Sequence, residues 1–180
     1  MSVAALLNQI RHAQVEILQS MPYRDFGVDG NKGASDTAVR VAEQRLGRPL
    51  PPSYREFLRI FDGWPRFYDG ATLLGTASLG RRMYDDLARA AFEAAETPEP
   101  ELGPPSRFKP KVLIPFGIDM QATTLFVFNP TCVSESGEYE VIAWMNEIGV
   151  RRSSFESFLE MILELCQSEL QAAAALGFSF

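Results

Sequence analysis

Carboxylates are the most numerous side chains of this sequence that could act in catalysis. The candidates for a catalytic acid or base are Asp62, Asp69, Asp85, Asp86 and Asp119. General acid–base catalysis needs two carboxylates in unlike surroundings. Asp85 and Asp86 are adjacent within a predicted helix, so their side chains point in different directions. Asp62 precedes Gly63, and turn chemistry alone explains an Asp-Gly pair. We therefore predict a protein that is not an enzyme, and a carboxylate-based enzyme is kept as an alternative.

The sequence contains few residues of the types that bind metal ions or cofactors. His12 is the single histidine, which excludes multi-histidine metal sites and allows a Ser-His-Asp arrangement only if this side chain leaves its helix surface. Cys132 and Cys166 lie far apart, without a CxxC spacing or a neighbouring histidine, so zinc has too few ligands. We expect both to be buried thiols, with a disulfide as the alternative. No metal and no cofactor is predicted.

Phosphate groups and nucleic acids are also disfavoured as ligands. The glycines of 27–33 follow no predicted strand and precede no G-K-[ST] sequence, so a flexible loop explains them better than a phosphate loop. A net charge of −6 opposes nucleic-acid binding, whose affinity comes mainly from basic side chains. The arginine pairs at 81–82 and 151–152 are isolated in this acidic chain. A basic protein partner fits the charge better, unless the charge only keeps a small domain in solution.

Aromatic side chains crowd together between two of the candidate aspartates. Trp64, Phe67 and Tyr68 surround Pro65 in a predicted loop or strand edge. Exposed aromatic rings next to carboxylates suit an interface, because ring area supplies affinity and acidic charge steers a basic partner. The alternative is that Trp64 or Phe67 packs against the third helix as core. The predicted partner-binding residues are Asp62, Trp64, Tyr68, Asp69 and Asp119.

Length and composition predict one domain over residues 1–180. A chain of 180 residues with 46% hydrophobic content can bury a substantial core without metals or disulfides. The first ten residues already alternate apolar with polar side chains, which is unlike a secretion signal. The longest apolar stretches, at 112–116 and 125–128, are far too short to cross a bilayer. We expect a cytoplasmic protein that does not insert into membranes.

Helical periodicity dominates the first third of the chain. Apolar residues recur at three and four positions from Val3 to Leu18, which predicts an amphipathic helix. A loop over 22–34 follows, and then a short helix with Ser35 or Asp36 as its cap and Gly47 just past its end. The prolines of 48–52 predict an extended connection.

The third helix is predicted to begin at Ser53, where Glu56 completes a capping box, and to end at the Asp62-Gly63 turn. Its buried face should carry Tyr54, Phe57, Leu58 and Phe61.

The rest of the sequence predicts strands and two further helices. Short strands are expected around 71–74, followed by a helix over about 79–95 with Met83, Leu87 and Ala91 at four-residue spacing. A proline-rich loop covers 98–110. The segments 112–115, 123–128 and 139–144 predict a meander of antiparallel strands.

The closing helix is predicted to start with a capping box of Ser153 and Glu156 and to continue through the alanines of 172–175.

Three strings of the sequence resemble those of the SUKH superfamily, and they occur in the family's order. The string VAEQRLGRPLPPSYREFLRIFDGW resembles the opening signature E..LG..LP..Y..FL...(N/D)G. VLIPFGID resembles the family's strand with its IP.G.D turn, and SSFESFLEMIL resembles its closing helix. The matched core runs over about 36–167. After Asp119 the chain has Met120, Gln121 and Ala122 where the family often shows a glycine-rich turn with a second acidic residue.

The resemblance implies an α+β fold: a single domain with a mixed, mainly antiparallel sheet flanked by helices, and the N-terminal helix 2–20 packed on it. It also implies protein binding. Many bacterial members are immunity proteins that neutralise toxin domains, and fungal members are scaffolds with disordered arms. This chain shows no such arms, which favours an immunity protein whose partner is a toxin domain, such as a nuclease, with a basic active-site surface. An intracellular scaffold is the alternative.

Overall fold

Five helices and six strands form along the described residues 1–94, 112–121, 123–145 and 148–175 of the computed structural model. In chain order they are α1 (Val3–Ser20), α2 (Asp36–Leu46), α3 (Pro52–Ile60), β1 (Trp64–Tyr68), β2 (Ala71–Leu73), α4 (Arg82–Ala94), β3 (Ile114–Ile118), β4 (Thr124–Val133), β5 (Tyr139–Met145), β6 (Ile148–Arg152) and α5 (Phe155–Ala175).

The strands form one sheet whose spatial order is the chain order, β1-β2-β3-β4-β5-β6. Each neighbouring pair is antiparallel, so the predicted meander is confirmed and extends over the whole sheet. Strand β6 was not predicted, because Ile148–Arg152 is short and contains a glycine and two arginines. The predicted α+β class is confirmed.

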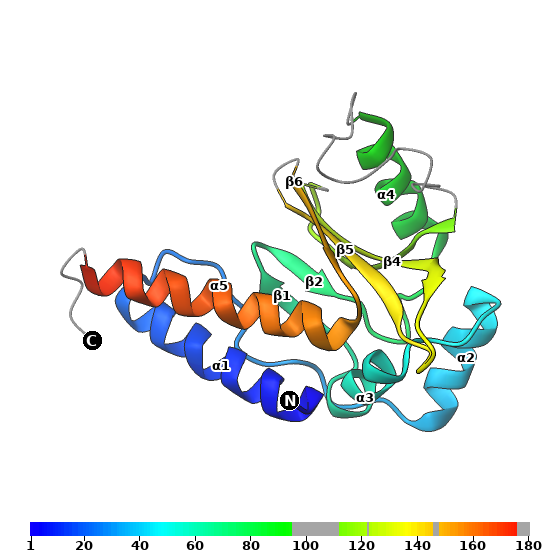
Figure 1. Cartoon of the computed structure of the whole chain (residues 1–180), viewed down its shortest axis with the longest axis horizontal. Helices are drawn as coiled ribbons and strands as arrows, with labels where there is room; N and C mark the ends of the chain where they lie inside the picture. The colour runs from blue at the N-terminus through cyan, green and yellow to red at the C-terminus, as the bar shows by residue number, and fades with distance from the viewer. Residues whose placement is uncertain (95–111, 122, 146–147, 176–180) are drawn as a thin grey trace.

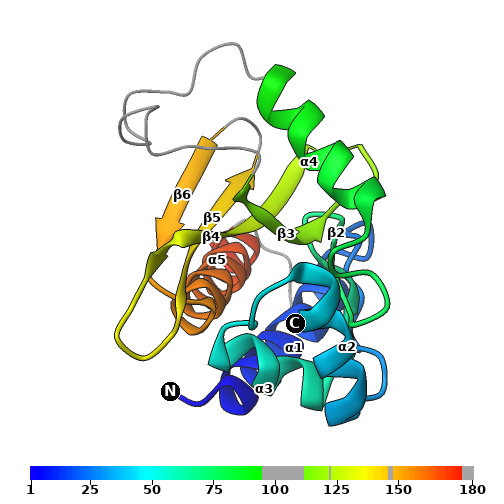
Figure 2. The ribbon, with the colours of Figure 1, turned by 90° about the vertical axis from the view of Figure 1, so that its right-hand side faces the viewer.

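The helices are divided between the two sides of the sheet. Helices α1 and α5 lie side by side beneath it, and α4 lies on the other side against β3 (Figures 1 and 2). Helix α3 packs between α1 and the start of α5, with α2 beside it. The predicted packing of the N-terminal helix on the domain therefore takes the form of a helix pair with α5.

A loop protects the free edge of β1. The backbone N–H of Gly27 donates to the carbonyl of Arg66 at 2.7 Å, and that of Asn31 donates to the carbonyl of Gly63 at 2.9 Å. A Cβ at position 27 would lie 1.9 Å from the carbonyl oxygen of Pro65, so only glycine allows this approach. The predicted loop thus covers one sheet edge, which would otherwise expose unpaired backbone groups.

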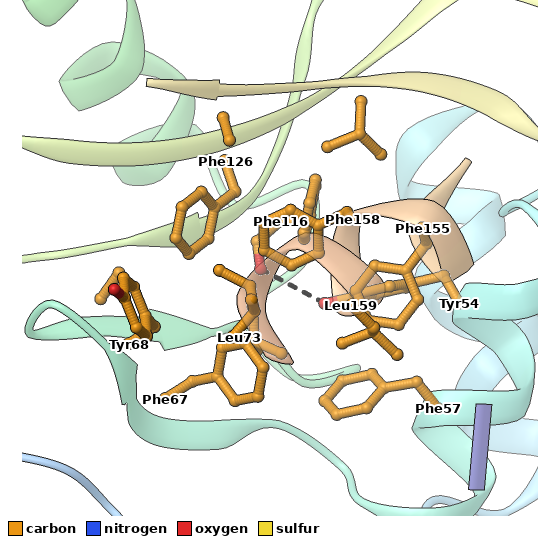
Figure 3. Close-up of a cluster of buried hydrophobic side chains, with 14 of the residues drawn as sticks. Tyr54, Phe57, Phe67, Tyr68, Leu73, Phe116, Phe126, Phe155, Phe158 and Leu159 are labelled. Atoms are coloured by element: carbon orange, nitrogen blue, oxygen red, sulfur yellow. Dashed lines mark hydrogen bonds between the residues drawn. The ribbon is translucent and has the colours of Figure 1, made fainter. Parts of the chain in front are cut away.

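The core under the sheet is a cluster of buried aromatic rings that includes Tyr54 (Figure 3). Ring centroids between 4.8 and 5.4 Å from that of Tyr54 belong to Phe57, Phe116, Phe128 and Phe155. The Tyr54 hydroxyl donates to the carbonyl of Leu74 at 2.7 Å, so this polar group is satisfied although the side chain is completely buried. Burial raises the pKa of Tyr54 well above its usual value, so the donor stays protonated.

The predicted ends of α1 and α2 are confirmed. Helix α2 has Ser35 as its cap, whose hydroxyl accepts from the N–H of Ala38, and ends at Gly47 in the left-handed region with φ +68°. Helix α5 extends through the alanines to Ala175, as predicted.

Both predicted capping boxes are wrong, although the helices form. Helix α3 starts at Pro52 without a side-chain cap, because the Ser53 hydroxyl donates to Glu138 at 2.6 Å instead. At α5 the reciprocal bonds join Ser154 and Ser157, whose hydroxyls each accept from the other's backbone N–H at 3.1 and 3.0 Å. A distant carboxylate and a neighbouring serine are better placed than the predicted partners.

Two predictions about burial also need correction. Met83 is 55% exposed, because α4 turns Ala88 toward the sheet, flanked by Tyr84, Leu87 and Ala91. Cys132 is exposed near the tip of the β4–β5 hairpin, whereas Cys166 is buried as predicted; both thiols are free. The predicted proline-rich loop over 98–110 lies outside the described residues.

The two cysteines should differ in reactivity. Burial raises the pKa of the Cys166 thiol to about 12, and only a thiolate reacts quickly with alkylating reagents. We expect iodoacetamide at pH 8 to label Cys132 in the native protein and Cys166 only after unfolding, as resolved by peptide mass spectrometry. The Cys132→Ser variant should lose the fast label, and equal rates at both thiols would contradict this packing.

Removing the Tyr54 hydroxyl should destabilise the protein without opening a cavity. Tyr54→Phe removes the hydrogen bond that the Leu74 carbonyl accepts at 2.7 Å, at a cost of about 1–3 kcal/mol in the free energy of unfolding. Tyr23→Phe is the matched control, since Tyr23 is 74% exposed. Urea denaturation measures both, and equal stability of the two variants would show that the bond does not contribute.

Candidate partner-binding surface

The turn between β1 and β2 is built from Asp69 and Gly70. Both have positive φ, +48° and +74°, and Tyr68 pairs with Ala71 across the turn. Two left-handed residues in a two-residue hairpin suit an Asp-Gly sequence, because this backbone follows the twist of the strands. The turn therefore places the Asp69 carboxylate at the end of the hairpin, where it is exposed.

The turn between β3 and β4 is closed by Asp119. Its backbone N–H donates to the carbonyl of Thr124 at 3.1 Å, and its carboxylate accepts from the Thr124 N–H at 3.2 Å. The other carboxylate oxygen accepts from the Thr123 hydroxyl at 2.6 Å. These bonds fix the direction in which Asp119 presents its charge.

The two turns meet at one end of the sheet. The Thr124 hydroxyl donates to Asp69 at 3.0 Å while its backbone binds Asp119, so one buried threonine joins the two carboxylates. A Cβ on Gly70 would lie 3.9 Å from the Cβ of Asp119. We call Asp69, Gly70, Asp119, Met120 and Thr123 the acidic turn surface.

The charges of this surface are not neutralised by neighbours. Neither Asp69 nor Asp119 forms an ion pair with any residue that the structure describes, whereas most surface arginines do pair with a carboxylate. Carboxylates that accept from hydroxyl and N–H groups keep lone pairs for further donors. The surface can therefore accept hydrogen bonds from lysine or arginine side chains of a partner.

Asp62 does not belong to this surface. It lies before β1, at the end opposite to Asp69, and is half-buried. Its carboxylate accepts from the backbone N–H of Thr76 at 2.5 Å and from the Thr76 hydroxyl at 2.9 Å. Asp62 thus holds the segment after β2, and the predicted acidic set does not gather on one face.

The aromatic residues near these aspartates are core. Trp64 is completely buried, with its ring between those of Phe61 and Phe67 and its indole N–H donating to the Gly27 carbonyl. Of the two alternatives for Trp64, the structure has the core one, and an exposed indole anchor is not present. Tyr68 is 7% exposed.

The Tyr68 hydroxyl lies 3.4 Å from Glu169 of α5. Burial and the nearby Glu169 raise the pKa of Tyr68.

Met120 is the apolar side chain that sequence reasoning missed at this surface. It is 82% exposed and follows Asp119 directly. The signal was present, because Met120 occupies the turn at which the sequence departs from the SUKH pattern, and a methionine in a tight turn has little core to reach. A flexible thioether suits an adaptable contact.

The other chemically able residues lie apart from this surface. His12 is exposed on α1, with Nδ1 2.7 Å from the Asn8 carbonyl oxygen, as expected for a solvated helical histidine. Asp86 pairs with Arg89 at 2.5 Å on α4. Within the described residues, no three His, Cys, Asp or Glu side chains gather as a metal site requires, and no helix is long and apolar enough to cross a membrane.

The residues of the opening signature hold the fold together. Glu43 accepts from the N–H of Leu50 at 2.8 Å and from Arg55 at 2.6 Å, which ties the proline connector to α2. Tyr54, Phe57 and Leu58 are buried in the core. The signature therefore identifies the architecture and leaves the binding face to other residues.

Comparison with known proteins gives one family. The chain matches the model of the SMI1 / KNR4 family (SUKH-1) over residues 33–163, which is more than half of its length. The match begins in the loop before α2 and ends within α5, and it includes the whole sheet. A search of curated proteins finds no match.

The two roles of the aspartates can be separated by stability. Asp62→Ala removes the acceptors of two Thr76 donors and should lower the free energy of unfolding by about 1–3 kcal/mol. Asp69→Asn keeps an oxygen for Thr124 and a side chain that tolerates positive φ, so it should change stability by less than about 0.5 kcal/mol. Chemical denaturation measures the free energy of unfolding of both variants. A large decrease in Asp69→Asn would show that Asp69 serves to stabilise the fold.

Proposed function

Because the chain belongs to the SMI1 / KNR4 family (SUKH-1), we propose that it is a non-catalytic protein-binding domain that acts as an immunity protein. It binds one bacterial toxin domain in the cytoplasm and blocks its active site. The partner carries a basic active-site surface, such as that of a nuclease. Neither a cofactor nor a metal takes part.

The acidic turn surface carries this proposal. It combines two carboxylates that pair with no described basic residue, Asp69 and Asp119, with the exposed side chain of Met120. Charge gives long-range attraction to a basic partner and apolar area gives contact energy once the two proteins meet. The carboxylates need no rearrangement to act, because Thr123 and Thr124 already hold them.

The chemistry of the target explains why an acidic surface is useful. A toxin that cleaves nucleic acid must present positive charge where phosphates bind. A negative blocker is steered to the same place and competes directly with the substrate. We expect such an interface to bury about 1,200–2,000 Å² in total, the range of stable protein complexes.

Rigid turns support tight binding. Both turns of the surface connect strands of one sheet: Tyr68 pairs with Ala71 across the first, and the Asp119 N–H donates to the Thr124 carbonyl across the second. Little conformational entropy is lost when such a surface binds, which favours one cognate partner over many weak ones. A scaffold would instead bind several partners weakly, and affinity measurements distinguish the two.

Removing charge from the acidic turn surface should slow association. Surface plasmon resonance against the toxin domain encoded beside this chain should show a lower association rate for Asp69→Asn and Asp119→Asn, and the wild-type rate should fall as salt rises. The control Asp36→Asn, on the exposed start of α2, should behave as wild type. Association that ignores salt and both substitutions would place the binding face elsewhere.

Met120 should act after the encounter. Met120→Ala removes exposed apolar contact area and should speed dissociation with little change in the association rate. Met83→Ala on α4 is the matched control, because Met83 is also exposed and lies away from this surface. Identical dissociation rates for the two variants would remove Met120 from the interface.

A further inference from the structure

A cavity of about 310 Å³ lies between the end of α2, the helix α4 and the start of β3. Its charged lining residues are Arg45, Arg48, Asp85 and Arg89. Three guanidinium groups face one carboxylate here, in a chain whose net charge is −6. We call these four residues and the space between them the arginine pocket.

Arg45 is held in place by the fold. Its Nη1 donates to the carbonyl oxygens of Thr76 at 3.0 Å and Leu79 at 2.6 Å, so two bonds hold the guanidinium at the segment between β2 and α4. Guanidinium carries five N–H donors, and these two bonds use one nitrogen. The remaining donors of Arg45 form no hydrogen bond with the residues that the structure describes, which leaves a preorganised group at the pocket wall.

Arg48 and Arg89 add two further positive charges to the pocket. Arg48 follows α2, is exposed, and makes no ion pair with any described residue. Arg89 pairs with Asp86 through one nitrogen at 2.5 Å, and Asp86 does not line the pocket. A planar, forked cation matches the two oxygens of a carboxylate or phosphate group, and several such forks on one pocket favour an anion.

The rest of the lining is apolar and small. Leu46, Ala88, Leu113, Ile114 and Pro115 belong to it, and Gly80 forms part of the wall with φ +68°. A pocket of this size lies at the lower limit for small-molecule sites. Arginines combined with apolar walls suit a compact molecule that has an anionic group at one end and an apolar body.

The geometry points to a binding site for a small anionic molecule, with Arg45, Arg48 and Arg89 holding its phosphate or carboxylate group and the apolar wall holding its body. The site lies at the start of β3, and the acidic turn surface lies at the end of the same strand. The ligand would therefore leave that surface open, and this inference does not depend on the proposed function.

Nuclear magnetic resonance of the ¹⁵N-labelled full chain tests the site. Inorganic phosphate, phenyl phosphate and succinate are added separately at constant ionic strength. We expect saturable shifts of the Ala88 and Ile114 amides, with phenyl phosphate binding more tightly than inorganic phosphate because its ring contacts the apolar wall. Saturation by the phosphates alone would assign a phosphate ligand, and saturation by succinate alone a carboxylate ligand.

Substitutions distinguish the pocket from diffuse charge attraction. Arg48→Ala should weaken binding by at least about tenfold, because one charge-assisted contact is lost. Arg40→Ala, on the exposed side of α2 and outside the pocket, is the matched control and should bind as wild type. Shifts that do not saturate with any probe, or equal affinities for the two variants, would overturn the inference.

Discussion

The contacts of the Tyr54 side chain join α3 to the sheet and to α5, and most of the fold depends on them. Its ring touches rings from β3, β4 and α5, and its hydroxyl donates to the backbone after β2. A buried phenol hydroxyl needs a hydrogen-bond acceptor. The Leu74 carbonyl can accept from it only when α3 lies beside the end of β2. One side chain therefore fixes α3 against the sheet, while Phe155 and Phe158 bring α5 to the same point.

Carboxylates fix the segments around this core at long range. Glu43 holds the proline connector, Glu138 of the β4–β5 hairpin holds the start of α3, and Asp62 holds the segment that follows β2. Each accepts from a backbone N–H that no helix or strand satisfies, so these three carboxylates stabilise the fold.

The ends of β3 carry opposite charge. Its start borders the arginine pocket, whereas its last turn holds Asp119 beside Asp69. Fields of opposite sign at two sites of one molecule orient an approaching partner before contact. Under the two proposals made above, a basic partner would bind at the turns and an anionic small molecule in the pocket, so the two ligands would not compete for one surface.

Patterns among residues that are close in sequence were sufficient to predict the helices and strands that depend on those residues. The three- and four-residue periodicity located α1, α2, α3 and α5, the β-branched and aromatic runs located β3, β4 and β5, and the signature string indicated the family. The Asp69-Gly70 hairpin could also have been found, since an Asp-Gly pair between apolar residues favours this turn. Strand β6 could not, because it is specified by pairing with β5 more than by its own residues.

What depends on distant contacts was decided only by the tertiary structure. The Ser53 hydroxyl binds Glu138 and does not cap α3. Trp64 is buried in the core, and Cys132 is exposed on a hairpin. Asp62 and Asp69 both precede a glycine in the sequence, yet Asp62 is half-buried and binds Thr76, whereas Asp69 is exposed and binds Thr124. The sequence determined which residues can donate, accept or bury apolar area, and the packing of elements far apart in the chain determined which of them still face solvent.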